Sequence, residues 1–294
     1  LPIAAHAAEM GFEACIFPSE SAAECAELEN ITVFGADNLL DIIEILKSPE
    51  EAHRKITGQQ SCSLQSCGFT LPSNSNTGNT TGHTALAEND FALIKGQAMA
   101  KIGMEIAAAG NHNIILVGSP GCGKTLLAKS LPTILPPLDK KEAVETSKIY
   151  SVAGLLQNQL GFVRQRPFRA PHHTATVSSL TGGGSNGMPG EISLAHNGIL
   201  FADEFCEMPK RVMEALRGPM EDRKVTISRL KSKVEYPADF MLIAATNPCP
   251  CGYYGDGDRC TCTPAKRLGY ISKLSGPLMD RIDIQLVVSR VEAR

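Results

Sequence analysis

The sequence has no tryptophan, and aromatic residues account for only 5% of its 294 positions. It also lacks any apolar run near the roughly 18 residues that a membrane-spanning helix needs. No charged, hydrophobic leader of the secretory kind is present. The net charge of −3 gives no overall attraction to nucleic acid, so a nucleic-acid surface would have to be a local patch. We therefore expect a cytoplasmic globular protein that makes no contact with membranes.

Ten cysteines are present. In a small secreted chain this number would suggest disulfides, but in a cytosolic protein thiols stay reduced and clustered cysteines more often bind metal. The chain is longer than one typical domain, so we expect two domains or one large core with an appendage. It opens at Leu1 inside an apparent helix, which suggests a fragment of a longer protein.

The strongest motif lies at residues 113–125, with the sequence NIILVGSPGCGKT. Residues 114–117 are typical of a buried parallel strand, and the next eight fit G-x-x-x-x-G-K-[ST] at each fixed position. Such a loop points backbone N–H groups at phosphates, and the helix after it adds the positive end of its dipole. We expect Lys124 to reach the β- and γ-phosphates and Thr125 to bind Mg²⁺. A glycine turn that binds nothing is the alternative, which the order of strand, loop and helix disfavours. The expected nucleotide-binding residues are Gly118, Ser119, Pro120, Gly121, Cys122, Gly123, Lys124, Thr125 and Leu126.

Two further apolar strands are predicted to end in polar residues. Residues 198–204, GILFADE, end in Asp203 and Glu204. After a phosphate loop, the first carboxylate is expected to bind Mg²⁺ and the second to polarise the attacking water. Residues 240–247, FMLIAATN, end in Asn247, which is placed to hydrogen-bond the γ-phosphate or the lytic water. Together these residues predict Mg²⁺-dependent ATP hydrolysis.

Directly after this strand, two C-x-C pairs bracket a short loop that contains three glycines. The pairs are Cys249 with Cys251 and Cys260 with Cys262. Four thiolates can bind one tetrahedral Zn²⁺, whereas two disulfides are the alternative outside the cell. We favour structural zinc.

Two stretches are locally basic. Residues 164–173 hold three arginines and the adjacent His172 and His173. We expect either a cationic loop for a neighbouring subunit or polyanion or a plain surface loop. Metal binding is disfavoured because adjacent side chains do not share a face. Residues 224–236 alternate as in a β-hairpin, and residues 210–233 carry eight basic and three acidic side chains. This excess predicts contact with a phosphate backbone, although a solvated sheet edge is the alternative.

The first ninety residues differ in character from the rest. Residues 1–47 alternate short helices and strands, which are too few to close an independent core. Residues 48–89 are rich in Ser, Thr, Asn and Gly without an apolar period, so we expect a flexible linker. Cys62, Cys67 and His83 lie there, but their spacing fits no usual metal-ligand pattern.

With these residues in view, the chain resembles the magnesium-chelatase-like AAA+ ATPases of the ComM/YifB type. The resemblance covers residues 90–294 densely, and residues 1–47 resemble the end of the Lon-protease-like domain that precedes the AAA+ module in this family. The matching motifs are DFALIKGQ (90–97), the phosphate loop (118–125), RPFRAPHHT (166–174), PGEISLAHNGILFADE (189–204), ATNPCPCG (245–252) and SGPLMDRID (275–283).

The resemblance implies an α/β fold in which a parallel sheet flanked by helices forms the P-loop ATPase core at 90–294. It implies a homo-hexameric ring with ATP at subunit interfaces, Asn247 as γ-phosphate sensor and Arg281 as an arginine finger for the neighbour. From the residues alone, Arg281 could equally pair with Asp280 or Asp283. Residues 224–236 would be a hairpin aimed at the ring pore, and residues 176–190 the family's helix-2 insert. ComM-type members imply ATP-driven translocation on single-stranded or branched DNA during recombination.

Two departures from the family pattern bear on activity. The chain stops at Arg294, before the helical lid that carries a second sensor arginine in AAA+ proteins, so we expect weak ATP hydrolysis. Most of the Lon-like domain is also absent and no Ser/Lys pair can be matched, so we expect no protease activity. Two other functions stay open. The chain could be the ATPase subunit of a magnesium-chelatase-like complex that remodels a protein partner, or a nucleotide-dependent assembly scaffold.

Overall fold

The computed structural model describes residues 1–47 apart from 26 and 29, and then residues 89–156, 162–184, 187–228 and 233–290. Within those ranges, every helix is too short or too polar to cross a lipid bilayer. The chain divides into two compact units. Of the described residues, 1–47, 143–156, 162 and 163 belong to the first unit, and 89–142 and 164–290 belong to the second.

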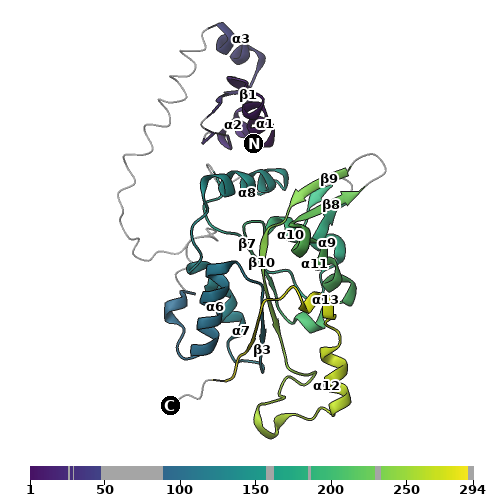
Figure 1. The fold of residues 1–294 in the computed structure, drawn as a ribbon. Helices are drawn as coiled ribbons and strands as arrows, with labels where there is room; N and C mark the ends of the chain where they lie inside the picture. The colour runs from purple at the N-terminus through teal and green to yellow at the C-terminus, as the bar shows by residue number, and fades with distance from the viewer. Residues whose placement is uncertain are drawn as a thin grey trace, which may run out of the picture. The chain divides into compact units, whose positions relative to one another are not determined.

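The first unit is built on two parallel strands, β1 (Ala14–Pro18) and β2 (Thr32–Ala36) (Figure 1). Three helices accompany them: α1 (Pro2–Glu9), α2 (Ser19–Ala23) and α3 (Leu39–Lys47). Helix α8 (Lys140–Val152) contributes most of its length to this unit, and there the Ser151 hydroxyl donates to the Glu24 carboxylate at 2.7 Å. The predicted linker, with Cys62, Cys67 and His83, lies outside the described residues except for Asn89.

The second unit contains a five-stranded sheet in the order β11-β3-β10-β7-β4, and every neighbouring pair is parallel. This confirms the predicted α/β fold with a parallel sheet. The strands are β3 (Ile114–Val117), β4 (Phe168–Arg169), β7 (Gly198–Ala202), β10 (Phe240–Thr246) and β11 (Ile284–Val287).

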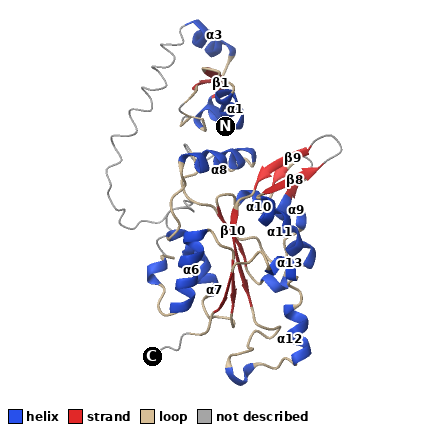
Figure 2. Ribbon diagram, viewed as in Figure 1, coloured by secondary structure: helices blue, strands red, loops and turns tan. Residues whose placement is uncertain are grey.

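Helices cover both faces of this sheet (Figure 2). Helices α6 (Ala98–Gly110) and α7 (Lys124–Ser130) lie on one face, and α11 (Lys210–Asp222) and α13 (Gly276–Met279) lie on the other. Alternate residues of a strand therefore enter different cores: Ile114 packs in the first and Ile115 in the second. Because both faces are covered, the central strands are continuously apolar rather than alternating.

The remaining elements connect these layers. Residues 176–190 hold α9 (Val177–Thr181), the two-residue strands β5 (Gly182–Gly183) and β6 (Met188–Pro189), and α10 (Glu191–Leu194) begins directly after them. The predicted hairpin is confirmed, because β8 (Lys224–Ser228) pairs antiparallel with β9 (Lys233–Pro237). Helix α12 (Pro264–Ile271) follows the cysteines, and 3₁₀ turns lie at Phe91–Leu93, Leu131–Thr133, Phe205–Glu207 and Gly257–Arg259. The stretch 164–173 is not entirely loop, because β4 pairs with β7.

Candidate functional site

Parallel pairing gathers the predicted site residues at one edge of the sheet. Strand β10 lies between β3 and β7, so their carboxyl ends emerge side by side, as in other open α/β sheets where ligands bind at this edge. A pocket of about 390 Å³ opens there. It is lined by Pro120, Gly121, Gly123, Lys124, Thr125, Leu126, Asp203, Glu204, Ala245, Thr246 and Asn247.

Lys124 begins α7 directly after the glycine loop and is 92% buried, with 8% of its surface exposed. Its ammonium donates to the carbonyls of Gly118 at 2.6 Å and Ser119 at 3.0 Å, and to the side-chain oxygen of Asn247 at 3.3 Å. A buried ammonium needs such acceptors. The two residues assigned to the γ-phosphate thus lie in direct contact although 123 positions separate them in the sequence.

Thr125 and Asp203 form the second contact across the pocket. The Thr125 hydroxyl donates to the Asp203 carboxylate at 3.0 Å. A hydroxyl and a carboxylate are hard oxygen donors of the kind that Mg²⁺ prefers. These two side chains therefore fit the predicted magnesium site in chemistry and in proximity.

Glu204 lines the pocket beside them, in an unusual backbone conformation. Its φ is +50°, in the left-handed region, and its N–H donates to the Asp203 carboxylate at 2.9 Å. Positive φ in a residue other than glycine carries strain that functional sites often retain. The Glu204 carboxylate contacts His173, whose Nδ1 lies 3.0 Å from Oε2. The motif PHHT thus places His173 beside the pocket residue Glu204, a contact that the sequence analysis did not predict.

Arg281 lies apart from this pocket. Its guanidinium contacts Glu221 of α11 at 3.0 Å, so its ion-pair partner differs from Asp280 and Asp283, which the sequence left open as alternatives. Asp283 instead accepts from the Asn113 N–H at 3.0 Å. Arg281 is not among the described residues that line the pocket.

Two side chains that the sequence did not single out for the site hold the phosphate loop. The amide of Gln97 donates to the Cys122 carbonyl at 3.0 Å and to the Ser289 carbonyl at 2.6 Å. Arg290 donates to the Pro120 carbonyl at 3.1 Å. Gln97 lies in DFALIKGQ, one of the motifs that carry the family resemblance, and this was the only feature of the sequence that pointed to it.

The four cysteines after β10 converge. All four sulfur atoms of Cys249, Cys251, Cys260 and Cys262 lie within 4.8 Å of one another. The Cys249 and Cys251 sulfurs lie 3.3 Å apart, and the Cys251 and Cys260 sulfurs lie 3.7 Å apart. A tetrahedral Zn²⁺ with Zn–S bonds of about 2.3 Å would place its sulfurs about 3.8 Å apart. The donor set and the spacing fit zinc.

The acidities of these thiols are set by their neighbours. The Tyr253 backbone N–H, and then the Cys249 thiol, stabilise the Cys251 thiolate and lower its pKa to about 6. The backbone N–H of Cys251 acts to lower the pKa of Cys262, but the Cys251 side chain and burial outweigh it and raise that pKa to about 11. One thiolate is thus preformed at neutral pH, while a metal would have to displace a proton from Cys262.

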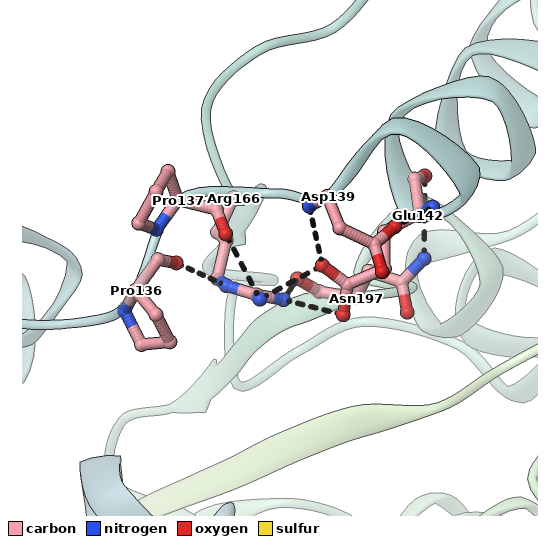
Figure 3. Close-up of polar contacts among 6 residues, drawn as sticks. All are labelled: Pro136, Pro137, Asp139, Glu142, Arg166 and Asn197. Atoms are coloured by element: carbon pink, nitrogen blue, oxygen red, sulfur yellow. Dashed lines mark hydrogen bonds and ion pairs between the residues drawn. The ribbon is translucent and has the colours of Figure 1, made fainter.

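Two of the three arginines at 164–169, Arg166 and Arg169, make ion pairs and hydrogen bonds within the protein. Arg166 donates to the carbonyls of Pro136 at 2.7 Å and Asn197 at 2.8 Å, and contacts both carboxylate oxygens of Glu142 at 3.3 and 2.9 Å (Figure 3). Arg169 binds Glu191 in the same bidentate manner, at 2.7 and 2.8 Å. These two guanidiniums tie loops within the second unit together.

The hairpin β8–β9 carries its charges in pairs. Lys224 and Lys233 both contact Glu235, at 3.6 and 3.0 Å, and Arg223 contacts Asp239 at 3.1 Å. Hydrogen bonding and charge from Lys233, together with Lys224, lower the pKa of Glu235, so this acid stays ionised at neutral pH. The predicted excess of positive charge is thus partly compensated by acids just beyond residue 233. Residues 229–232, which hold Arg229 and Lys231, lie outside the described part of the chain.

Comparisons with known proteins identify the family of this chain. The model of the family described as magnesium chelatase, subunit ChlI, matches residues 90–294. The protein YifB of Salmonella typhimurium is 48% identical over 202 residues, covering 69% of this chain and 40% of the relative. A Mycobacterium tuberculosis protein is 37% identical over all 294 residues, 54% of its own length. The competence protein ComM of Haemophilus influenzae is 39% identical over 284 residues, covering 96% of this chain and 52% of the relative. The chain thus spans about half the length of the relatives that it matches, and it belongs to the magnesium-chelatase ChlI family of AAA+ proteins.

Proposed function

We propose that this chain carries the nucleotide-binding core of an AAA+ ATPase, with residues 90–294 as that core and residues 1–47 as the end of a Lon-like domain. One observation carries the proposal. Three neighbouring strands bring Lys124, the Thr125–Asp203 pair and Asn247 around a single pocket. Glycine turns occur in many folds, but this convergence of an ammonium, hard oxygen donors and an amide is what a magnesium triphosphate requires.

Each pocket residue has a task in this proposal. Lys124 would exchange its carbonyl acceptors for β- and γ-phosphate oxygens, and Asn247, already at its side, would donate to the γ-phosphate. Thr125 and Asp203 would hold Mg²⁺, which when bound neutralises charge on the phosphates. Glu204 would accept the proton of the attacking water as a general base. Backbone N–H groups of residues 118–125 would surround the phosphates at the start of α7.

We further propose that the ATPase is a homo-hexameric motor acting on DNA. The resemblance to ComM-type ATPases implies DNA as the substrate, and the basic residues of 210–233 supply charge for phosphate contacts. Arg281 lies outside the described lining of its own pocket, and its side chain is 33% exposed. An arginine in that position can serve a neighbouring subunit's triphosphate, which supports ring assembly with composite sites.

A second function keeps support from the matched family itself, whose description is a magnesium-chelatase subunit. In that case the ATPase would remodel a protein partner and would not respond to DNA. A nucleotide-dependent scaffold is a third possibility, in which Glu204 would be dispensable. The partly neutralised charge of β8–β9 does not rule against the DNA hypothesis, because separating exposed ion pairs costs little free energy.

We also propose that the four converging cysteines hold a structural Zn²⁺. Their sulfur spacing and thiol chemistry are the support for this ion.

Steady-state ATP hydrolysis with and without single-stranded DNA separates these functions. The DNA motor predicts stimulation that weakens as salt rises and that both Glu204→Gln and Arg281→Ala abolish. Turnover that ignores DNA length and salt would contradict the motor and favour the chelatase-type function. Unchanged behaviour of Glu204→Gln would favour the scaffold.

A further inference from the structure

The loop that carries the four cysteines, residues 249–262, rests directly on the phosphate loop. Gly252 lies at φ +86°, and a Cβ placed on it would meet Cδ and Cγ of Pro120 at 2.8 Å. The same Cβ would lie 3.8 Å from Cγ of Asn247. The backbone of this cysteine loop therefore packs against the phosphate loop at a point where no side chain fits without displacement.

A second connection runs through Arg290. Its guanidinium donates to the Pro120 carbonyl at 3.1 Å and lies 3.7 Å from the carboxylate of Asp256, in the middle of the cysteine loop. That carboxylate oxygen is buried and makes no hydrogen bond in the described structure. Arg290 therefore joins the cysteine loop, the phosphate loop and the end of the sheet at one point.

The sulfur cluster brings the two arms of the cysteine loop together, and Arg259 of the second arm also lies 3.5 Å from the Asp256 carboxylate. The backbone hydrogen bonds from the Gly252 N–H to the Cys249 carbonyl at 2.9 Å and from the Asp256 N–H to the Tyr253 carbonyl at 3.0 Å close local turns within the loop. Contacts between the arms include those of Cys260 with Cys249 at 3.8 Å and with Cys251 at 3.7 Å. Weak thiol contacts would give way to four metal–sulfur bonds if Zn²⁺ bound, which would fix Gly252 and Asp256 in place.

We propose that Zn²⁺ in the cysteine loop sets the affinity of the phosphate loop for nucleoside triphosphate, with Gly252 and Arg290 as the positioning residues. This inference rests on the proposed nucleotide binding. Coupling between two sites is reciprocal, so triphosphate must raise zinc affinity by the same factor by which zinc raises triphosphate affinity. No change in the chemistry of hydrolysis is involved.

The first test compares binding of a fluorescent ATP analogue with Mg²⁺ to the zinc-loaded protein and to chelator-stripped protein, with zinc content measured in each. We expect affinity to fall by at least about fivefold on stripping, the lower end of common coupling strengths, and to return when Zn²⁺ is restored. Competition with a zinc indicator, with and without the analogue, should give the same factor. Equal affinity in the loaded and stripped forms would overturn the coupling.

A matched pair of glycine variants tests the contact without removing metal. Gly252→Ala and Gly255→Ala both place alanine at φ +86°, but a Cβ at Gly255 has nothing within 4 Å. Both variants carry the same backbone strain, so a difference between them reports the contact with Pro120. We expect Gly252→Ala to keep its zinc and lose at least about fivefold in nucleotide affinity, while Gly255→Ala binds like the wild type.

The outcomes separate this inference from the function on which it rests. Equal nucleotide affinity of the two glycine variants, with zinc retained in both, would overturn the coupling and leave the proposed ATPase untouched. Absence of nucleotide binding by the zinc-loaded wild type would overturn the proposed function as well. A protein that takes up no zinc at micromolar metal would overturn the metal site and with it the inference.

Discussion

The Nδ1 atom of His173 lies 3.0 Å from the Oε2 atom of Glu204, and the His172 ring lies 4.1 Å from the His173 ring. The candidate general base, Glu204, is therefore in contact with a side chain from the segment that follows β4. We expect His173→Ala to lower kcat by about tenfold to a hundredfold, because misplacing a catalytic group by an ångström costs rates of this order. Nucleotide affinity should stay unchanged, and His173→Gln, which keeps a hydrogen-bond donor, should recover much of the rate. Unaltered kcat in His173→Ala would contradict this role.

The Arg166 contacts predict that substituting this residue lowers the stability of the protein and not its catalytic rate. Its side chain is 16% exposed and that of Glu142 is 31% exposed. Removing the guanidinium leaves the partly buried carboxylate with the Asp139 N–H but without its ion-pair partner, and it takes the donor from the carbonyls of Pro136 and Asn197. We expect Arg166→Ala to lower the free energy of unfolding by about 2–4 kcal/mol. Urea denaturation measures this.

Arg223→Ala is the control for that measurement. Arg223 also contacts a single carboxylate, that of Asp239, but its side chain is 68% exposed. An exposed pair contributes at most about 1 kcal/mol. Equal losses in the Arg166 and Arg223 variants would show that the Arg166 contacts carry no special weight.

The hairpin makes a directional prediction about DNA. Glu235 contacts both Lys224 and Lys233, and its lowered pKa keeps it ionised. Glu235→Gln should release both lysines, raise affinity for single-stranded DNA and steepen the dependence of log affinity on log salt by about one charge. Lys233→Gln should do the opposite. If neither substitution moves the salt dependence in a fluorescence-anisotropy titration, the hairpin does not contact the DNA backbone.

Composite sites predict complementation between two inactive variants. Arg281→Ala keeps its own Glu204, and Glu204→Gln keeps Arg281 for its neighbour. In a head-to-tail ring of randomly mixed subunits, about one quarter of the interfaces would hold both groups intact. We expect each variant alone to be inactive and the mixture to recover ATP hydrolysis. A mixture as inactive as its components would contradict an arginine supplied by the neighbour.

Much of this site follows from sequence patterns because the determining features are local. A buried parallel strand, a glycine loop and a lysine in fixed order predict the phosphate loop, and strands that end in Asp203 or Asn247 must share its edge once the sheet is parallel. The confirmed hairpin at β8–β9 comes from alternating hydrophobicity. The strands of the confirmed sheet come from continuous apolar runs, and the parallel-sheet fold comes from the family resemblance.

The sequence did not predict the contacts between segments that come close together only in the folded chain. Gln97, Arg290 and His173 reach the site from distant segments, and no periodic pattern marks a side chain that donates to a remote carbonyl. The stretch 164–173 was expected to be either a cationic loop or a plain surface loop, because the partners of Arg166 and Arg169, Glu142 and Glu191, lie more than twenty positions away. Charge counted along a chain does not reveal which charges neutralise each other in space.

The central claim is tested most directly by measuring both the binding and the hydrolysis of magnesium ATP. The measurement compares the wild type with the variants Lys124→Ala and Glu204→Gln. Lys124→Ala should lose both, because its ammonium is the buried cation of the pocket. Glu204→Gln should bind the nucleotide with unchanged affinity while losing at least about a hundredfold in turnover, the size of a general-base contribution. The wild type should bind the nucleotide and hydrolyse it. Nucleotide binding that survives Lys124→Ala, or turnover that survives Glu204→Gln, would contradict the assignment of this pocket as the ATPase site.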